Sequence, residues 1–200
     1  MMKFYLPIIT ALFIFSCNNA KTNTETASNA FSELDTTINF STFFPVGEFL
    51  NGQIMEIKKS NARPLKITVK NGKSDSIWLK KEQLDVLFNE FYSPLIDSAS
   101  YSPFFKESKF FDQSINAITL TYDVENNLPD TIPWKHWDIY IDPESNQVKR
   151  LFLVKQITPD KIRQLTWLPG KSCRGITIIN NSSTEDEVTV KWSYTDSNDQ

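Results

Sequence analysis

The chain has 200 residues, of which 40% are hydrophobic and 13% are aromatic, and its formal net charge is −3. This composition is sufficient for one globular domain with a buried core, and it excludes disorder of the whole chain. The sequence lacks the clustered lysine and arginine with which proteins bind DNA or RNA, so no nucleic-acid partner is expected.

The first residues have the composition of an export signal. Met1-Met2-Lys3 begins the chain with a positive charge, and the twelve residues from Phe4 to Phe15 are uncharged and almost entirely apolar. As a helix this segment would span roughly 18 Å, which is less than the hydrocarbon thickness of a membrane, about 30 Å. The pattern therefore predicts a signal peptide over residues 1–16 rather than a membrane-spanning helix.

The residues that follow, Ile14-Phe15-Ser16-Cys17, resemble the lipobox of bacterial lipoproteins, although Phe15 is bulkier than the residue usual at that place. The resemblance implies cleavage before Cys17 and acylation of its thiol, with chains such as palmitate. Two or three acyl chains hold a protein firmly to a membrane. We therefore expect the protein in the bacterial cell envelope, on the outer membrane with its domain in the periplasm.

A polar segment separates Cys17 from the rest of the chain. Residues 18–29 include no large apolar side chain, and such a segment cannot bury enough surface to fold. Residues 17–40 are therefore predicted to be the lipidated cysteine and a flexible tether. Lipid on Cys17 would leave Cys173 without a disulfide partner, and we expect Cys173 to be a small buried side chain rather than a reactive thiol.

The residues from 41 to 196 predict a single α+β domain. Apolar residues at helical spacing after Pro45 predict an amphipathic helix that begins at Val46. A second amphipathic helix is predicted over residues 80–92, and residues 93–109 are predicted to be a loop.

Strands dominate the rest of the domain. Asn71-Gly72 is a strong signal for a type I′ turn and predicts a short hairpin between residues 65–69 and 76–79. Short turns between successive strands then predict a curved antiparallel meander of five or six strands. The segments with strand character are 118–124, 134–141, 148–157, 162–168, 172–179 and 188–194.

The apolar residues on both sides of the turn at 142–147 suggest how the two strands of this hairpin pair. Pairing Ile141 with Lys149 places the apolar side chains of both strands on one face. The pairs on that face are then Ile139 with Leu151 and Trp137 with Leu153. The opposite face is mixed and carries His136, Asp138 and Tyr140 beside Val154, Phe152 and Arg150. This mixture predicts partial cover by a helix or loop, or an exposed groove.

The order of elements resembles the helix-packed, curved sheets of envelope lipoproteins and lipoprotein carriers. It is also similar to uncharacterised lipoproteins of Bacteroidota, in which a strand and turn like residues 139–144 lead into a segment like residues 163–167. The resemblance implies a fold and a membrane anchor, and it implies no activity.

Few residues are candidates for chemistry. His136 is the only histidine, and no spacing of histidine and cysteine indicates a zinc site, so no metal or cofactor is expected. Asp138 and Tyr140 lie on the face of His136 and could tune its proton transfer. Residues that could form a ligand or partner surface are Trp134, His136, Asp138, Tyr140, Phe104 and Phe105.

Three functions are compatible with this sequence. The first is a non-enzymatic envelope lipoprotein that binds a protein or lipid partner with its sheet or a groove. The second is an enzyme with an unconventional site around His136, Asp138 and Tyr140. The third is a structural or assembly accessory at the outer membrane. A continuous apolar cavity between sheet and helices would favour ligand carriage, whereas a closed core with a flat exposed aromatic patch would favour a protein partner.

Overall fold

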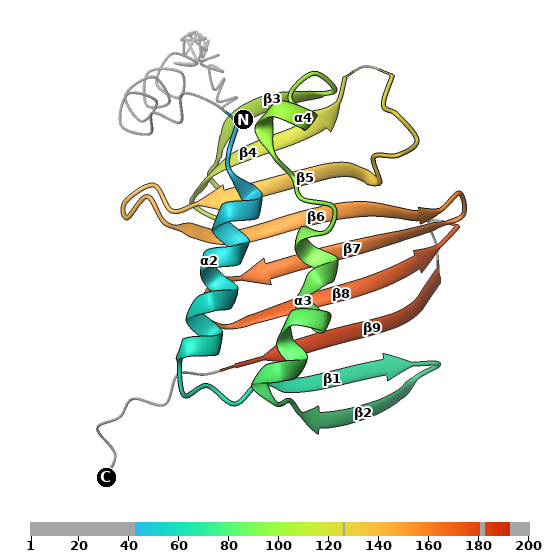
Figure 1. Ribbon diagram of the computed structural model, residues 1–200. Helices are drawn as coiled ribbons and strands as arrows, with labels where there is room; N and C mark the ends of the chain where they lie inside the picture. The colour runs from blue at the N-terminus through green and yellow to red at the C-terminus, as the bar shows by residue number, and fades with distance from the viewer. Residues whose placement is uncertain (1–42, 126, 181–182, 193–200) are drawn as a thin grey trace, which may run out of the picture.

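The computed structural model of the chain describes residues 43–125, 127–180 and 183–192. The predicted signal peptide over residues 1–16, Cys17 and the predicted tether lie outside these residues, as does the end of the last predicted strand. The described residues form an α+β fold in which two helices pack across one face of an antiparallel sheet (Figure 1).

The sheet has nine strands in the order β2-β1-β9-β8-β7-β6-β5-β4-β3. The strands are β1 (Leu65–Lys70), β2 (Lys73–Trp78), β3 (Phe105–Asp112), β4 (Ala117–Val124), β5 (Trp134–Ile141), β6 (Val148–Thr158), β7 (Lys161–Leu168), β8 (Ser172–Ile179) and β9 (Ser183–Lys191). The strands from β3 to β9 form an antiparallel meander, as predicted. Because β9 also pairs with β1, the N-terminal hairpin joins the meander, and the sheet is larger than the five or six strands predicted.

The helices are α2 (Val46–Lys59), the 3-10 turn η1 (Lys81–Gln83), α3 (Leu84–Tyr92) and the single turn α4 (Ser98–Tyr101). Both predicted amphipathic helices are confirmed, and the second begins as η1. In α2 the buried residues Leu50, Ile54 and Ile57 recur at helical spacing and form one apolar stripe.

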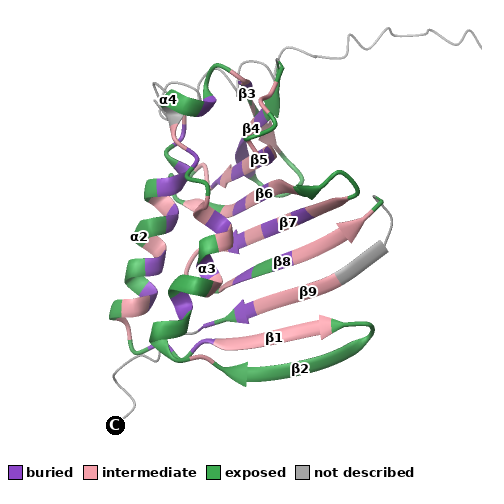
Figure 2. Ribbon diagram, turned by 45° about the vertical axis from the view of Figure 1, so that its right-hand side comes forward, coloured by how far each residue is buried: buried purple, intermediate pink, exposed green. Residues whose placement is uncertain are grey.

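The core lies between α2, α3 and the sheet, where Figure 2 shows the buried residues of the helices on the sides that meet the strands. Phe88 and Phe91 of α3 contact Trp167 of β7 edge to face, with ring centroids 5.1 and 5.3 Å apart. Trp192 packs on the same indole at 5.3 Å. These aromatic contacts hold α3 against the middle of the sheet.

The predicted turn at Asn71-Gly72 is confirmed. Both residues have positive φ angles, 51° at Asn71 and 72° at Gly72, as a type I′ turn requires. This turn joins β1 to β2 and makes β2 one edge of the sheet.

The predicted pairing of β5 with β6 is confirmed along most of the two strands and is wrong at the end next to the turn. Ile139 pairs with Leu151 and Trp137 with Leu153, but Ile141 pairs with Val148 instead of Lys149. A bulge leaves Lys149 as an extra residue beside the turn. Lys149 therefore leaves the ladder, and the apolar Val148 takes the place opposite Ile141.

The prediction of a loop over residues 93–109 is wrong, because this region contains α4 and the first half of β3. The row of β3 that pairs with the apolar row Val124, Tyr122, Leu120 and Ile118 of β4 is Phe105, Glu107, Lys109 and Phe111. Charged residues occupy half of this row, so the strand lacks an apolar period of two. Such polar composition is common in edge strands, which it protects from further pairing.

Candidate functional site

The face of the sheet opposite α2 and α3 gathers polar and aromatic side chains from several strands, and we call it the outer face. Cross-strand pairs such as Asp138 with Phe152 and Phe152 with Thr166 place alternate residues of neighbouring strands side by side. The outer face includes Thr121, Asp123, His136, Asp138, Tyr140, Arg150, Phe152, Gln164, Thr166, Arg174, Ile176 and Glu187.

His136 lies between two carboxylates on this face. Its Nδ1 is 2.7 Å from Asp123 Oδ1, and its Nε2 is 3.0 Å from Asp138 Oδ2. Both ring nitrogens can donate only when the imidazole is protonated. The hydrogen bond to Asp138 is the main reason that the pKa of His136 rises to about 9. The side chain is therefore an imidazolium at neutral pH.

Asp138 connects this ion pair to the neighbouring strand positions. Its Oδ1 accepts a hydrogen bond from Thr121 Oγ1 at 2.6 Å, and its Oδ2 accepts one from Tyr140 Oη at 3.3 Å. Burial raises the pKa of Asp138, but the hydrogen bonds from His136 and Thr121 outweigh it and leave that pKa below its usual value. The carboxylate is thus charged and fixed in place.

A shallow cavity of about 330 Å³ lies next to this cluster. Its lining residues are Asp138, Tyr140, Arg150, Phe152, Gln164, Thr166, Arg174 and Ile176. The Arg150 guanidinium lies 3.7 Å from the centre of the Tyr140 ring, a cation–π contact. Arg174 binds Glu187 with two hydrogen bonds of 2.7 Å. On the outer face, His136 is therefore paired with two carboxylates and Arg174 with Glu187, while Arg150 stacks on Tyr140.

The two hydrogen bonds of His136 make it a poor general base. A general base has to be unprotonated when substrate arrives, and His136 carries its proton up to about pH 9. Side chains that are locked by hydrogen bonds and ion pairs present a fixed pattern of donors and acceptors to a partner.

The residues predicted to form a ligand or partner surface are divided between two faces. His136, Asp138 and Tyr140 lie together on the outer face. Trp134 is fully buried and Phe105 nearly so, and Phe104 is half-buried against the same core.

The position of Trp134 follows from a second bulge. Trp134 pairs with Lys155 while His136 pairs with Val154, so Lys135 is an extra residue in β5. The bulge reverses the alternation and turns Trp134 into the core, where its Nε1 donates to Pro94 O at 2.8 Å. Alternation alone places Trp134 and His136 on the same face.

Sequence reasoning missed the members of the outer face that come from β4, β7, β8 and β9, and three of them are charged. Asp123 and Glu187 reach it only through the pairing of β4 with β5 and of β8 with β9, and Arg174 through the pairing of β7 with β8. The register of β4 against β5, which places Asp123 opposite His136, is the signal that could have identified the first of them.

Cys173 is a buried apolar side chain, as predicted, with only 3% of its surface exposed. Burial raises the pKa of its thiol well above the usual value, which suppresses the reactive thiolate. Cys17 lies outside the described residues.

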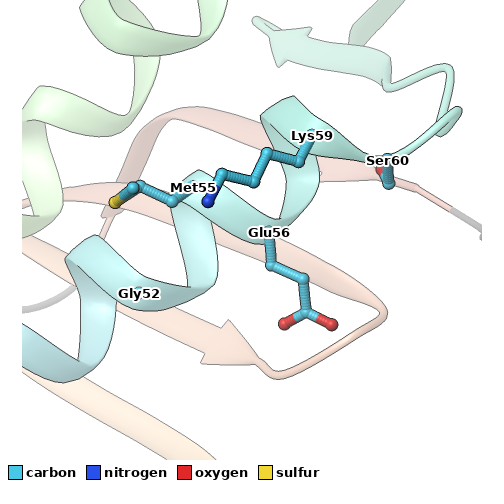
Figure 3. A pocket seen from close by; sticks show the side chains of 5 residues that line it. All are labelled: Gly52, Met55, Glu56, Lys59 and Ser60. Atoms are coloured by element: carbon cyan, nitrogen blue, oxygen red, sulfur yellow. The ribbon is translucent and has the colours of Figure 1, made fainter.

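A separate hollow of about 640 Å³ lies on the exposed side of α2 (Figure 3). Its lining residues are Gly52, Met55, Glu56, Lys59 and Ser60. The side chains of Met55 and Lys59 extend in one direction and that of Glu56 in another, so no group of polar atoms converges there. This hollow carries no recognisable chemistry.

Within residues 43–192, as far as the structure describes them, no group of three or more histidine, cysteine or acidic side chains could hold a metal ion. No helix in this same part of the chain has the length and apolar composition that crossing a membrane requires. No protein-family model, no curated protein and no solved structure matches the chain.

Proposed function

We propose that this protein is a lipoprotein of the bacterial cell envelope, anchored through acyl chains on Cys17, that binds a partner protein with the outer face of its sheet. The lipobox-like Ile14-Phe15-Ser16-Cys17 supports the anchor. The paired, half-buried polar side chains of the outer face support the binding role, and this arrangement is the observation on which the proposal depends.

A partner protein suits the outer face better than a small substrate does. The cavity there is shallow, and its walls alternate charged, amide and apolar side chains. Ordered side chains lose little conformational entropy when they enter an interface. Tyr140 and Arg150, which stack on each other, belong to the residue types that contribute most to protein interfaces.

The inner face of the sheet gives less support to a lipid carrier. Leu50 of α2, Phe88 of α3 and Trp167 of β7 are all fully buried, so packed side chains fill the centre of the space between helices and sheet. A carrier for acyl chains needs an apolar cavity that opens to its cargo. We therefore place the partner on the outer face.

The alternative function, an enzyme with a site near His136, Asp138 and Tyr140, has less support. Asp123 and Asp138 occupy both ring nitrogens of His136, so a substrate would have to displace a carboxylate before it could exchange a proton. No contact in the site favours this second candidate.

The anchor is tested by the mass of the N-terminal peptide of the mature protein from its native bacterial host. The proposal predicts a peptide that begins at Cys17 and carries acyl chains, and a protein in the membrane fraction. Cys17→Ser is the control and is expected to abolish acylation. A chain that still begins at Met1, or that is soluble and unacylated, would contradict the anchor.

A further inference from the structure

Strands β6 to β9 extend beyond α3 on the helix-bearing face, so the helices leave one end of that face open (Figure 1). A cavity of about 390 Å³ lies at this open end, and we call it the basic cavity. Its lining residues are Lys70, Glu90, Lys155, Ile157, Lys161, Arg163, Thr177 and Asp186. It belongs to the opposite face of the sheet from His136.

Arg163 forms a fixed wall of the basic cavity, with 8% of its surface exposed. Its Nε donates to Glu90 at 3.0 Å, and its Nη1 donates to Thr177 at 2.8 Å and to Asp186 at 3.2 Å. Side chains from α3, β8 and β9 therefore hold one guanidinium in place, and its charge is neutralised by two carboxylates.

Gly175 of β8 makes room for this guanidinium. A β-carbon at Gly175 would lie 2.5 Å from Arg163 Nη2 and 2.8 Å from Arg163 Cζ. A glycine inside a strand weakens the strand, and it often marks a close approach of another group. Glycine therefore stands at position 175 although it weakens the strand, because a larger residue would collide with Arg163 in the wall of the basic cavity.

Lys155 lies directly opposite Arg163 across β6 and β7. Like charges in this position repel each other. The Lys155 ammonium donates to Ser93 O and lies 5.1 Å from the centre of the Trp134 ring. Among the described residues no carboxylate lies within ion-pair distance of it, and burial lowers its pKa. Lys155 is therefore a partly desolvated cation, and its ammonium group, which has three N–H donors, can donate further hydrogen bonds to a ligand.

The charges of the cavity favour an anionic ligand. Both acidic side chains of its described lining, Glu90 and Asp186, pair with Arg163, and Lys70 and Lys155 add two further positive charges. A phosphate group carries about −1.5 to −2 charges at pH 7 and offers three strong acceptor oxygens. A lysine ammonium binds such a group as a point charge.

We propose that the basic cavity binds a phosphate group, with Lys155 and Lys70 as its cationic ligands and Arg163 as the fixed wall behind them. The phosphate comes either from a free ion or from the headgroup of an anionic lipid. This site lies on the other face of the sheet from the proposed partner surface, so its test is independent of the proposed function.

Isothermal titration calorimetry of the full-length protein in zwitterionic detergent at low salt tests the site, with inorganic phosphate as the probe. We expect Lys155→Gln to weaken phosphate binding at least tenfold and Lys70→Gln to weaken it several-fold. Lys171→Gln removes an exposed lysine at the opposite end of β7 and β8, and it should change the affinity less than twofold.

Dihexanoyl phosphatidic acid below its micellar concentration, with dihexanoyl phosphatidylcholine as the zwitterionic control, distinguishes the two sources. Tighter binding of phosphatidic acid than of phosphate, lost in Lys155→Gln, would identify a lipid headgroup, and equal affinities would identify a free ion. The proposal is overturned if neither phosphate nor phosphatidic acid binds, or if Lys155→Gln binds like the wild type. Should Lys155→Gln not fold, unchanged binding in Lys70→Gln overturns it.

Discussion

His136 is central to the electrostatics of the outer face, because it forms ion pairs with two carboxylates, Asp123 on β4 and Asp138 on β5. Its pKa of about 9 comes from the hydrogen bonds to Asp138 and Asp123, against the opposing effect of burial. Removing either carboxylate should therefore bring the pKa back toward the usual 6.5.

We predict that NMR titration of the imidazole gives a pKa near 9, and that Asp138→Asn lowers it. A pKa that is raised in the folded state stabilises the fold fully below about pH 6.5, and the stabilisation is lost as the pH rises through about 9. His136→Gln should therefore cost about 2 kcal/mol of unfolding free energy at pH 6 and much less at pH 10, allowing for the exposure of Asp123. A wild-type pKa near 6.5 would contradict this geometry.

Two glycines of α2 differ in what surrounds them. A β-carbon on Gly52 would meet nothing within 4 Å, whereas one on Gly47 would lie 2.2 Å from Leu95 Cδ1. Alanine inside a helix is favoured over glycine by about 0.5–1 kcal/mol. We predict from urea denaturation that Gly52→Ala stabilises the protein by that amount and that Gly47→Ala gains less, because Leu95 has to move. The reverse order would contradict the packing of α2.

At the scale of the elements, one cluster of aromatic side chains holds helix α3 against the sheet. Phe88 is fully buried between Trp167 and Trp192, with ring centroids 5.1 and 6.0 Å away. Truncating a buried phenylalanine to alanine costs about 3–5 kcal/mol. We predict a loss of this size for Phe88→Ala in denaturant unfolding. Val86 of the same helix is 84% exposed, and Val86→Ala should cost less than about 0.5 kcal/mol. Equal losses would exclude α3 from the core.

The sequence predicts well those elements whose apolar residues recur with the period of a strand or a helix. The alternation of Trp137, Ile139 and Ile141 defines β5, and the bounds of β5 agree with the prediction. Strand β3 was missed because Glu107 and Lys109 interrupt its apolar row. The pairing of β1 with β9 joins segments that are more than a hundred residues apart, and no local pattern encodes it.

The residues of the candidate site could be predicted where strand alternation alone determines the face of the sheet on which they lie. Strand alternation places His136, Asp138 and Tyr140 on one face, which the structure confirms. Alternation alone would also place Trp134 there, but the bulge at Lys135 reverses the alternation and turns Trp134 toward the core. A bulge depends on how two strands pair, so one strand read alone cannot reveal it.

On the scale of the whole molecule, the sheet separates two surfaces of different chemistry. The outer face presents paired charges and aromatic side chains, and the basic cavity at the open end of the other face is lined by cationic side chains, among them Lys70 and Lys155. Phe44 N donates to the buried Tyr122 Oη at 2.9 Å and ties the start of the described chain to the sheet. The tether predicted from the sequence, about twenty residues, would hold the domain on the order of 25 Å from the proposed membrane anchor.

Site-specific photo-crosslinking in membranes of the native host tests the outer face most directly. A photoreactive residue at Thr166, in the centre of the outer face, should crosslink to one defined protein, and Tyr140→Ala with Arg150→Ala should abolish that product. The same residue at Val86, exposed on α3, should give no such product. If the photoreactive residue at position 166 gives no crosslink, or gives the same products as the one at position 86, the result would contradict a partner surface on the outer face.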